Sequence, residues 1–309
     1  MWFRNARVFR FTKPFDISPE ELEEKLAADA FKPCGPQEPA RHGWVPPLGK
    51  HGEVLVHSAD GYHLIALRKE EKLLPAPVIK ERVEEKAELI EQEQGRKVRK
   101  KEKDELKEEV MLEMLPRAFS RNRRSFAYLA PAEGVLVVDA GSAKQAEDLA
   151  SALRKSIGSL PVRPPVLEQA PAFTFTGWLN ESIDLPAAIE LGTECELKDP
   201  SEDGGVVRCK GLDLRADEIQ NHLEAGMQVT RLSLSWDENV SFVLDEEFGI
   251  RRLKFGETLQ EKLEEVDADD AAAKFDAAFS LMTLELSRLI PGLLEALGGE
   301  DRSAIVEQE

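Results

Sequence analysis

The chain has 309 residues, enough for two domains, since most domains contain roughly 100–200 residues. Hydrophobic residues make up 42% and charged residues 32%, so the composition suits a buried core and not a disordered chain. There is no run of about 18 apolar residues and no apolar signal-peptide segment, and Cys34, Cys195 and Cys209 form no Cys-x-x-Cys pair. We therefore expect a soluble cytoplasmic protein without a membrane span, a disulfide framework or a zinc ribbon.

The net charge of −18 hides a strong asymmetry along the chain. Residues 1–165 contain 29 Lys and Arg against 27 Asp and Glu, whereas residues 166–309 contain 12 against 32, so the balances are +2 and −20. Three basic stretches lie in the first half, at residues 1–15, 94–107 and 117–124. Each alone is typical of a solvated surface, but together they favour a positive surface for a polyanion.

The first half predicts strands and helices in mixed order. Alternation predicts a strand at 2–11, and Ser18-Pro-Glu-Glu21 is a capping box that begins a helix through Ala30. After a proline-rich loop, the remaining expected elements are a hairpin over 53–57 and 62–68, strands at 125–130 and 134–139, a helix at 142–157 and a linker at 161–165.

A helical hairpin interrupts this pattern. A narrow apolar stripe at Ile79, Val83, Ala87 and Ile90 predicts a helix over 78–94. Asp104 is the predicted cap of a second helix, whose stripe is Leu106, Val110 and Met114, ending before Pro116. An arm of about 16 residues would project about 24 Å. The alternative is a helical pair packed flat on the body.

The second half predicts an acidic α+β domain. Strands are expected at 173–179, 187–197, 206–212, 228–236, 240–245 and 250–255, and helices at 215–225, 257–266 and 271–297. The fold class is α+β, with two α/β-type halves, mostly antiparallel sheets and a projecting helical hairpin. The expected domains are 1–76 continued by 117–160, the arm at 77–116, and 161–309.

The usual signatures of catalysis and cofactor binding are absent from the sequence. It has no phosphate-binding loop, no dinucleotide-binding glycine turn and no nucleophile elbow. His42, His51, His57 and His63 are spaced nine, six and six residues apart, which does not match metal-binding helices. We expect no cofactor and no metal site, and we expect Cys34, which has no adjacent base, to be a loop or core thiol.

One alternative is a metal-dependent nuclease. Asp184, followed by Glu196 and Lys198 in a Glu-x-Lys pattern, could hold Mg²⁺ and activate water. In so acidic a segment this spacing also arises by chance, with Lys198 paired to its neighbours.

The segment 115–124 suggests a different chemistry. Phe119 lies among Arg117, Arg121, Arg123 and Arg124. An aromatic ring can wedge or stack on bases while arginines hold phosphates. The alternative is that Phe119 packs beneath the arm as a core residue.

Several motifs in order resemble the recombination-associated RdgC family of bacteria over nearly the whole chain. They are FKPCG at 31–35, GWVPP at 43–47, RKEEK at 68–72 with 75–80, LPRAFSR at 115–121, EDGGVVR at 202–208 and RRLKF at 251–255. The stretch Asn122-Arg123-Arg124 departs from the family by being more basic.

The resemblance implies a non-enzymatic, nucleoid-associated protein in the cytoplasm. It implies a homodimer closed into a ring that encircles duplex DNA independently of sequence and limits access of RecA filaments. Carried onto this chain, Phe119 with Leu115 belongs to a ring-closing contact or lies near DNA, and Lys210 binds DNA. The expected DNA contacts are Lys80, Lys97, Lys100, Lys101, Arg117, Phe119, Arg121, Arg123 and Arg124, followed by Arg4, Arg7 and Lys210. A third alternative makes the acidic half a surface for a protein partner.

Overall fold

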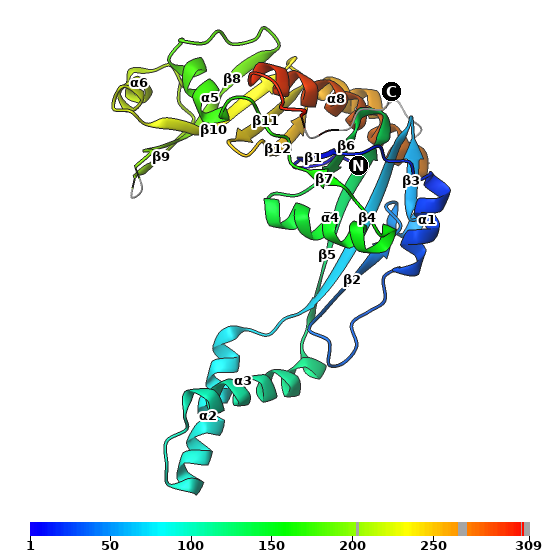
Figure 1. Cartoon of the computed structure of the whole chain (residues 1–309), viewed down its shortest axis with the longest axis vertical. Helices are drawn as coiled ribbons and strands as arrows, with labels where there is room; N and C mark the ends of the chain where they lie inside the picture. Colours follow the sequence, from blue (N-terminus) through cyan, green and yellow to red (C-terminus); the bar gives the residue numbers. More distant parts are fainter. Residues whose placement is uncertain (202–203, 265–270, 304, 306–309) are drawn as a thin grey trace. The chain divides into compact units, whose positions relative to one another are not determined.

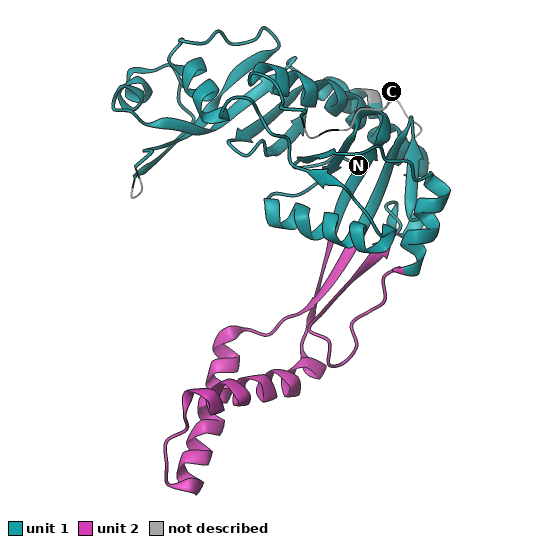
Figure 2. Ribbon diagram, in the orientation of Figure 1, with its two compact units in different colours: residues 1–28, 46–66, 125–309 teal, residues 29–45, 67–124 magenta. Residues whose placement is uncertain are grey.

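The computed structural model describes residues 1–201, 204–264, 271–303 and 305. The chain divides into two compact units (Figure 2). Unit 1 comprises residues 1–28, 46–66 and 125–309, and unit 2 comprises residues 29–45 and 67–124. Each unit has its own hydrophobic core and is described by itself.

The first sheet of unit 1 has the strand order β4-β5-β6-β1-β7, with β3 paired to β4 (Figure 1). Its strands are β1 (Arg7–Phe11), β3 (Val56–Ala59), β4 (Tyr62–Lys72), β5 (Ser120–Ala130), β6 (Val135–Val138) and β7 (Val162–Arg163). Asp60 and Gly61, with φ of 52° and 82°, form the left-handed turn of the β3–β4 hairpin. Helices α1 (Pro19–Ala28) and α4 (Ala143–Ile157) pack against each other, and the Oγ of Ser142 accepts the Gln145 N–H to cap α4.

The second sheet of unit 1 is entirely antiparallel, in the order β12-β11-β10-β8-β9 (Figure 1). Its strands are β8 (Ile189–Lys198), β9 (Val206–Lys210), β10 (Gln228–Trp236), β11 (Val240–Asp245) and β12 (Ile250–Phe255). The helices of this half are α5 (Pro171–Leu179), α6 (Asp217–Glu224), α7 (Glu257–Glu264) and α8 (Ala271–Ala296). Helix α5 contacts β10.

Helix α8 lies in the core of unit 1. By length and composition it is the one helix in the described ranges that could cross a membrane. Its residues Phe279, Met282 and Leu286 are at most 1% exposed and belong to a cluster that includes Tyr128 and Trp178. This burial inside the protein explains its apolar composition.

A buried ion pair joins the two halves of unit 1. Arg7 of β1 donates to the Asp245 carboxylate at the end of β11 over 2.8 Å, and their side chains are 8% and 4% exposed. Ala6 and Ile250 exchange two backbone hydrogen bonds beside it, of 2.7 and 3.0 Å. Residues separated by about 240 positions are thereby held in one unit.

Unit 2 contains β2 (Ala40–Val45), the outer parts of β4 and β5, and helices α2 (Ala76–Gln94) and α3 (Lys100–Met114). The helices pack through Ile79, Val83 and Val110. Gly95 ends α2 in the left-handed conformation, with φ of 63°, which glycine adopts without steric cost. Short 3-10 turns occur at Leu115–Arg117 in this unit and at Gly49–His51 and Pro131–Glu133 in unit 1.

The predicted α+β class with antiparallel sheets is confirmed, but one predicted strand is wrong. Residues 173–179 lie in helix α5, which Pro171 begins. A short run rich in aromatic and β-branched residues fits a buried helix as well as a strand, so periodicity alone does not distinguish the two. Seven of its nine residues are buried, and packing on β10 decides the outcome.

Other boundaries also differ from the predictions. Helix α3 begins at Lys100 instead of after Asp104, because the Glu102 carboxylate accepts the Arg99 N–H and binds the Arg96 guanidinium. Strand β1 spans only Arg7–Phe11, β5 begins five residues earlier than expected, and β2 was predicted as a loop. The last two residues of the predicted helix 257–266 lie outside the described residues.

Gly249→Ala tests the buried Arg7–Asp245 ion pair that joins the two halves of unit 1. A methyl group at this position would collide with the Arg7 guanidinium and lie 2.6 Å from the Asp245 carboxylate. We expect a loss of about 2–4 kcal/mol in the free energy of unfolding, measured by urea denaturation. Gly205→Ala is the matched control, because nothing lies within 4 Å of its added methyl. Equal stability of the two variants would contradict the assigned role.

Candidate nucleic-acid interface

Seven of the twelve basic residues in the acidic half lie on the strands of the second sheet. They are Lys198, Arg208, Lys210, Arg231, Arg251, Arg252 and Lys254. All are exposed or half-buried, whereas Cys195, Leu197, Leu232 and Leu253 on the same strands are buried. The strands therefore have one apolar core face and one face rich in bases, which we call the basic sheet face.

The strand register brings these bases together. Glu196 of β8 is paired with Arg208 on β9 and with Arg231 on β10. Glu194 is paired with Lys210. Because side chains alternate between the two faces of a strand, all of these groups point to the same side of the sheet.

A β-bulge adds two more arginines to this face. The register of β11 and β12 shifts between Ser241 and Val243, opposite Arg251–Lys254, and Arg252 has a φ of 52°. A bulge lets consecutive residues face the same side. Arg251 donates to Asp245 over 2.7 Å, and Arg252 donates to Glu194.

Carboxylates occupy some of these guanidinium groups. Glu196 accepts from Arg208 over 2.7 Å and from Arg231 over 3.2 Å. The Glu196 side chain is 15% exposed, whereas those of Arg208 and Arg231 are 69% and 41% exposed. Arg252 holds the pKa of Glu194 below its usual value, mainly through their hydrogen bond. Lys210 and Lys254 have no ion pair within the described part of the chain.

A cavity of about 430 Å³ opens between these side chains. It is lined by Glu194, Glu196, Arg208, Lys210, Arg231, Arg251 and Arg252, together with Asn5, Gly141, Cys195, Cys209 and Val243. Its polar lining consists mainly of guanidinium groups, which are suited to phosphate or carboxylate oxygens.

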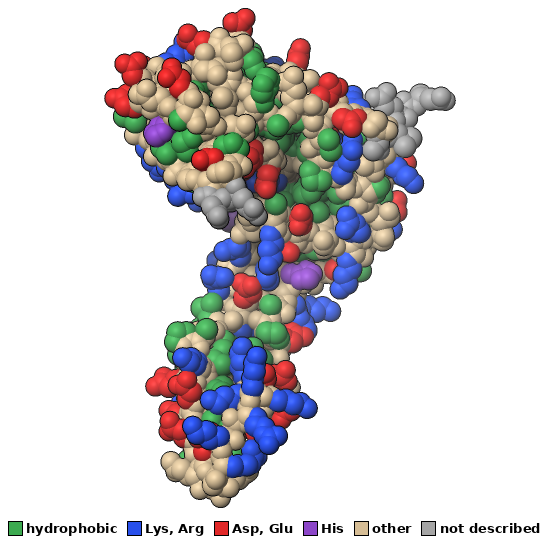
Figure 3. All heavy atoms as spheres, turned by 60° about the vertical axis from the view of Figure 1, so that its left-hand side comes forward, with side chains coloured by type: hydrophobic (Ala, Val, Ile, Leu, Met, Phe, Trp, Pro, Cys, Tyr) green, Lys and Arg blue, Asp and Glu red, His purple; other side chains and the backbone are tan. Residues whose placement is uncertain are grey.

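Unit 2 has a separate set of predicted DNA contacts. Lys97, Lys100, Lys101, Arg117, Arg123 and Arg124 are exposed, and none has an ion pair among the described residues. Lys80 pairs with Glu84 over 3.7 Å, and Arg121 pairs with Glu71 over 3.1 Å. In the space-filling view, basic and acidic side chains alternate over the helices of this unit (Figure 3). Its charge is therefore mixed, in contrast to the basic sheet face.

Phe119 is a solvent-exposed aromatic residue, not a core residue of unit 2. The residue is 84% exposed, although its carbonyl accepts a hydrogen bond from the Leu73 N–H over 2.7 Å. It borders an apolar groove of about 620 Å³ on unit 2 whose lining includes Val78 and Leu89, both partly exposed. Leu115, predicted with Phe119 at a ring-closing contact, is 3% exposed and lies in the core. Phe119 is thus the member of the pair available for contact.

The remaining predicted contacts separate into two kinds. Arg4 and Lys210 are exposed. Arg7 is 6% exposed and bound to Asp245 and Glu247, so the structure gives it a structural position. The alternation at 2–11 puts Arg7 on the side of Phe3 and Phe9, opposite Arg4.

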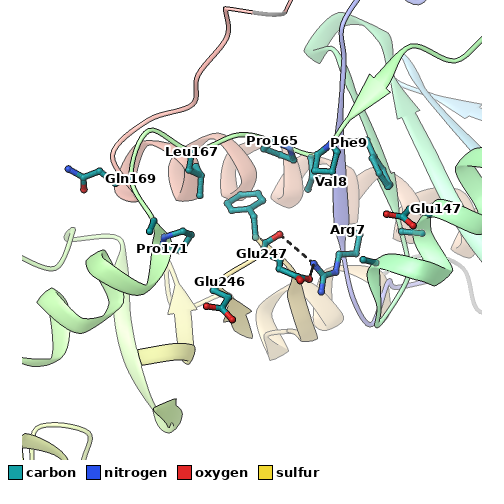
Figure 4. Close-up of a pocket in the computed structure, with 15 residues that line it drawn as sticks. Arg7, Val8, Phe9, Glu147, Pro165, Leu167, Gln169, Pro171, Glu246 and Glu247 are labelled. Atoms are coloured by element: carbon teal, nitrogen blue, oxygen red, sulfur yellow. Dashed lines mark hydrogen bonds and ion pairs between the residues drawn. The ribbon is translucent and has the colours of Figure 1, made fainter. Parts of the chain in front are cut away.

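A further cavity of unit 1 has apolar walls and an acidic rim. It measures about 570 Å³ and is enclosed by β1, the start of α4, residues 164–171 and the β11–β12 turn (Figure 4). Val8, Leu167 and Phe248 form apolar walls, and exposed Glu147, Glu246 and Glu247 lie at its edge. Its only basic side chain, Arg7, is already paired, so this cavity is not suited to a polyanion.

The predicted nuclease residues do not form a recognisable metal site. Asp184 is exposed in the loop between α5 and β8, and Glu196 is engaged by two arginines. In the ranges that the structure describes, no three His, Cys, Asp or Glu side chains are grouped so as to hold a metal ion. Cys195 and Cys209 face each other across β8 and β9 as free thiols, and burial raises the pKa of Cys195 to about 12.

The chain is similar along nearly its whole length to proteins of one known family. The family model described as "Putative exonuclease, RdgC" matches residues 1–300. The recombination-associated protein RdgC of Aeromonas hydrophila is 54% identical over 98% of this chain and all of its own length. Proteins of the same name from Tolumonas auensis and Yersinia enterocolitica are 50% and 49% identical over 97% of this chain and 99% of theirs.

The fold, the basic sheet face and these relatives together define a recombination-associated protein of α+β architecture. The chain belongs to the RdgC family.

Five bases of the sheet face, Arg208, Arg231, Arg251, Arg252 and Lys254, were not among the predicted site residues. They are spread over 47 positions in the acidic half, where averaging over sequence conceals them. The alternation in VVRCK at 206–210 is the local signal that could have identified a basic strand face.

Proposed function

We propose that this protein binds double-stranded DNA without sequence preference and is not an enzyme. The observation that supports this most is the basic sheet face: seven bases against the four carboxylates of Glu190, Glu194, Glu196 and Asp245, in a half of the chain whose balance is −20. Five strands span about 19 Å, comparable with the major and minor grooves of B-DNA together, about 12 and 6 Å wide.

Electrostatics supports phosphate contact at this face. Duplex DNA has one negative charge per about 1.7 Å of its axis, so a few bases per subunit supply strong, salt-dependent attraction. Acidic residues elsewhere in the same half repel DNA and direct it to the basic sheet face. Exposed bases of unit 2, such as Lys97, Lys100 and Arg123, add phosphate contacts in the same proposal.

We further propose a homodimer closed into a ring around the duplex, which limits RecA filament formation in the cytoplasm at the nucleoid. Family membership supports this mechanism. The exposed Phe119 beside an apolar groove supports its place at the contact between subunits, because a ring so exposed gains free energy on burial. Enclosure would slow dissociation without any base-specific contact.

The second candidate is a nuclease, which the description of the matching family model favours. In this candidate Glu196 would bind Mg²⁺ with Asp184, and Lys198 would assist the attack of water. The two arginine contacts of Glu196 oppose it, since they already neutralise that carboxylate.

Charge removal tests the proposed DNA surface. Lys210→Ala with Lys254→Ala, and separately Lys97→Ala with Lys100→Ala, are expected to weaken binding to all duplexes alike by about tenfold. Fluorescence anisotropy at several salt concentrations should show the slope of log K against log salt reduced by about 1–2. Lys144→Ala with Lys155→Ala, on exposed positions of α4, is the charge-matched control. If both double variants bind duplex DNA with the affinity and salt slope of the control, neither surface contacts DNA as proposed.

Phe119→Ser tests closure of the dimer. Because the ring is exposed in the chain, its removal is not expected to destabilise the fold, but it should weaken self-association by about tenfold or more. Analytical ultracentrifugation over a concentration series measures this directly. Leu112→Ser is the control, since Leu112 is also exposed, at 53%. Unchanged association of Phe119→Ser would exclude the proposed contact.

Incubation of supercoiled plasmid with Mg²⁺ or Mn²⁺ distinguishes the two candidates. We expect no nicking by the purified protein under conditions where it binds the plasmid. Nicking that disappears in Glu196→Ala would establish the nuclease instead.

A further inference from the structure

Two carboxylates lie at the centre of the basic sheet face, where phosphates would have to bind. Glu196 receives hydrogen bonds from Arg208 and Arg231, and Glu194 receives one from Arg252. All five side chains line the same cavity of about 430 Å³. A carboxylate and a phosphate use the same guanidinium donors, so the two cannot fully occupy one arginine at once.

We propose that Glu194 and Glu196 act as internal competitors of DNA phosphate for the arginines of the basic sheet face. This inference rests on the proposed DNA binding and adds how the same site is regulated. Without DNA, the carboxylates hold Arg208, Arg231 and Arg252 paired; on binding, phosphates displace them and take over the guanidinium groups.

The burial of the pairs supports exchange instead of a permanent structural role. The arginines are 41–69% exposed, so their outer N–H groups are open to a ligand, while the Glu196 side chain beneath them is only 15% exposed. Each pair has an exposed guanidinium on one side, so it is held less tightly than a pair buried on both sides. These pairs therefore cost less to exchange than the Arg7–Asp245 pair, in which both side chains are buried.

The Arg7–Asp245 pair, which joins β1 of the first sheet to β11 of the second, provides the contrast. Asp245 is 4% exposed and also accepts the Gly249 N–H over 2.6 Å. That pair is closed to solvent and fixes the fold, whereas the Glu196 pairs face the cavity. The exposure of the arginine partner thus distinguishes the structural carboxylate of Asp245 from the exchangeable carboxylate of Glu196.

The competition sets a threshold for binding. A ligand with one or two charges cannot replace both carboxylates, whereas a duplex presents a dense row of phosphates and replaces them together. Arg252 lowers the pKa of Glu194, which therefore stays ionised at neutral pH, so that release requires a competing anion instead of a proton. The arginines are expected to be available to duplex DNA and withheld from small anions.

Glu196→Gln tests the inference. We expect it to bind duplex DNA about three- to tenfold more tightly than the wild type, with a slope of log K against log salt steeper by about 1–2, because arginines are freed for phosphate. Glu190→Gln is the matched control, because this substitution removes the same charge from the same strand. Glu190 lies opposite Ser235 and has no arginine partner among the described residues. It should change affinity by less than about twofold.

Glu194→Gln is a second variant in case Glu196→Gln is poorly folded, as checked by circular dichroism and thermal unfolding. Either folded variant that binds more tightly than Glu190→Gln, with a steeper salt slope, supports the inference. Affinity equal to that of the control, or weaker than that of the wild type, would overturn it and assign the carboxylates to holding the arginines in place. A wild-type protein that binds no duplex at low salt would refute the proposed function itself.

Discussion

The buried carboxylate of Asp245 is the interaction on which the organisation of unit 1 depends. It accepts hydrogen bonds from Arg7, Arg251 and the Gly249 N–H, and its side chain is 4% exposed. A buried charge without these partners would cost several kcal/mol, so strand β1 must lie beside the β11–β12 turn. The first strand of the chain and the last strand of the second sheet are thereby placed in one core.

This constraint has a consequence for the basic sheet face. Arg251 binds the same Asp245 oxygen as Arg7, and the bulge beside it turns Arg252 outward towards Glu194. The core ion pair and the exposed arginine pairs are therefore consecutive parts of one polar network. Its buried end fixes the fold, and its exposed end presents guanidinium groups on a surface that otherwise belongs to an acidic half.

Many elements could be predicted from local sequence, because their signals are local. The helix expected at 142–157, the hairpin before residue 68 and the strand Ile250–Phe255 all agree with prediction. Helix α5 could not be predicted correctly from residues 173–179, since a short apolar segment fits a helix or a strand until its packing partner is known. Exposure of Phe119 was also open from sequence, where a core position was an equal alternative.

The sequence by itself determined the α+β class, the asymmetry of charge between the halves and membership of the RdgC family, because composition, periodicity and ordered motifs are properties of the linear chain. Only the tertiary structure decided which bases share a surface. Strand register placed Lys210, Arg231 and Arg252 on one face, and burial placed Arg7 in the core. The physical reason is that pairing and burial join residues far apart in sequence, whereas charge counts average over neighbours that point in opposite directions.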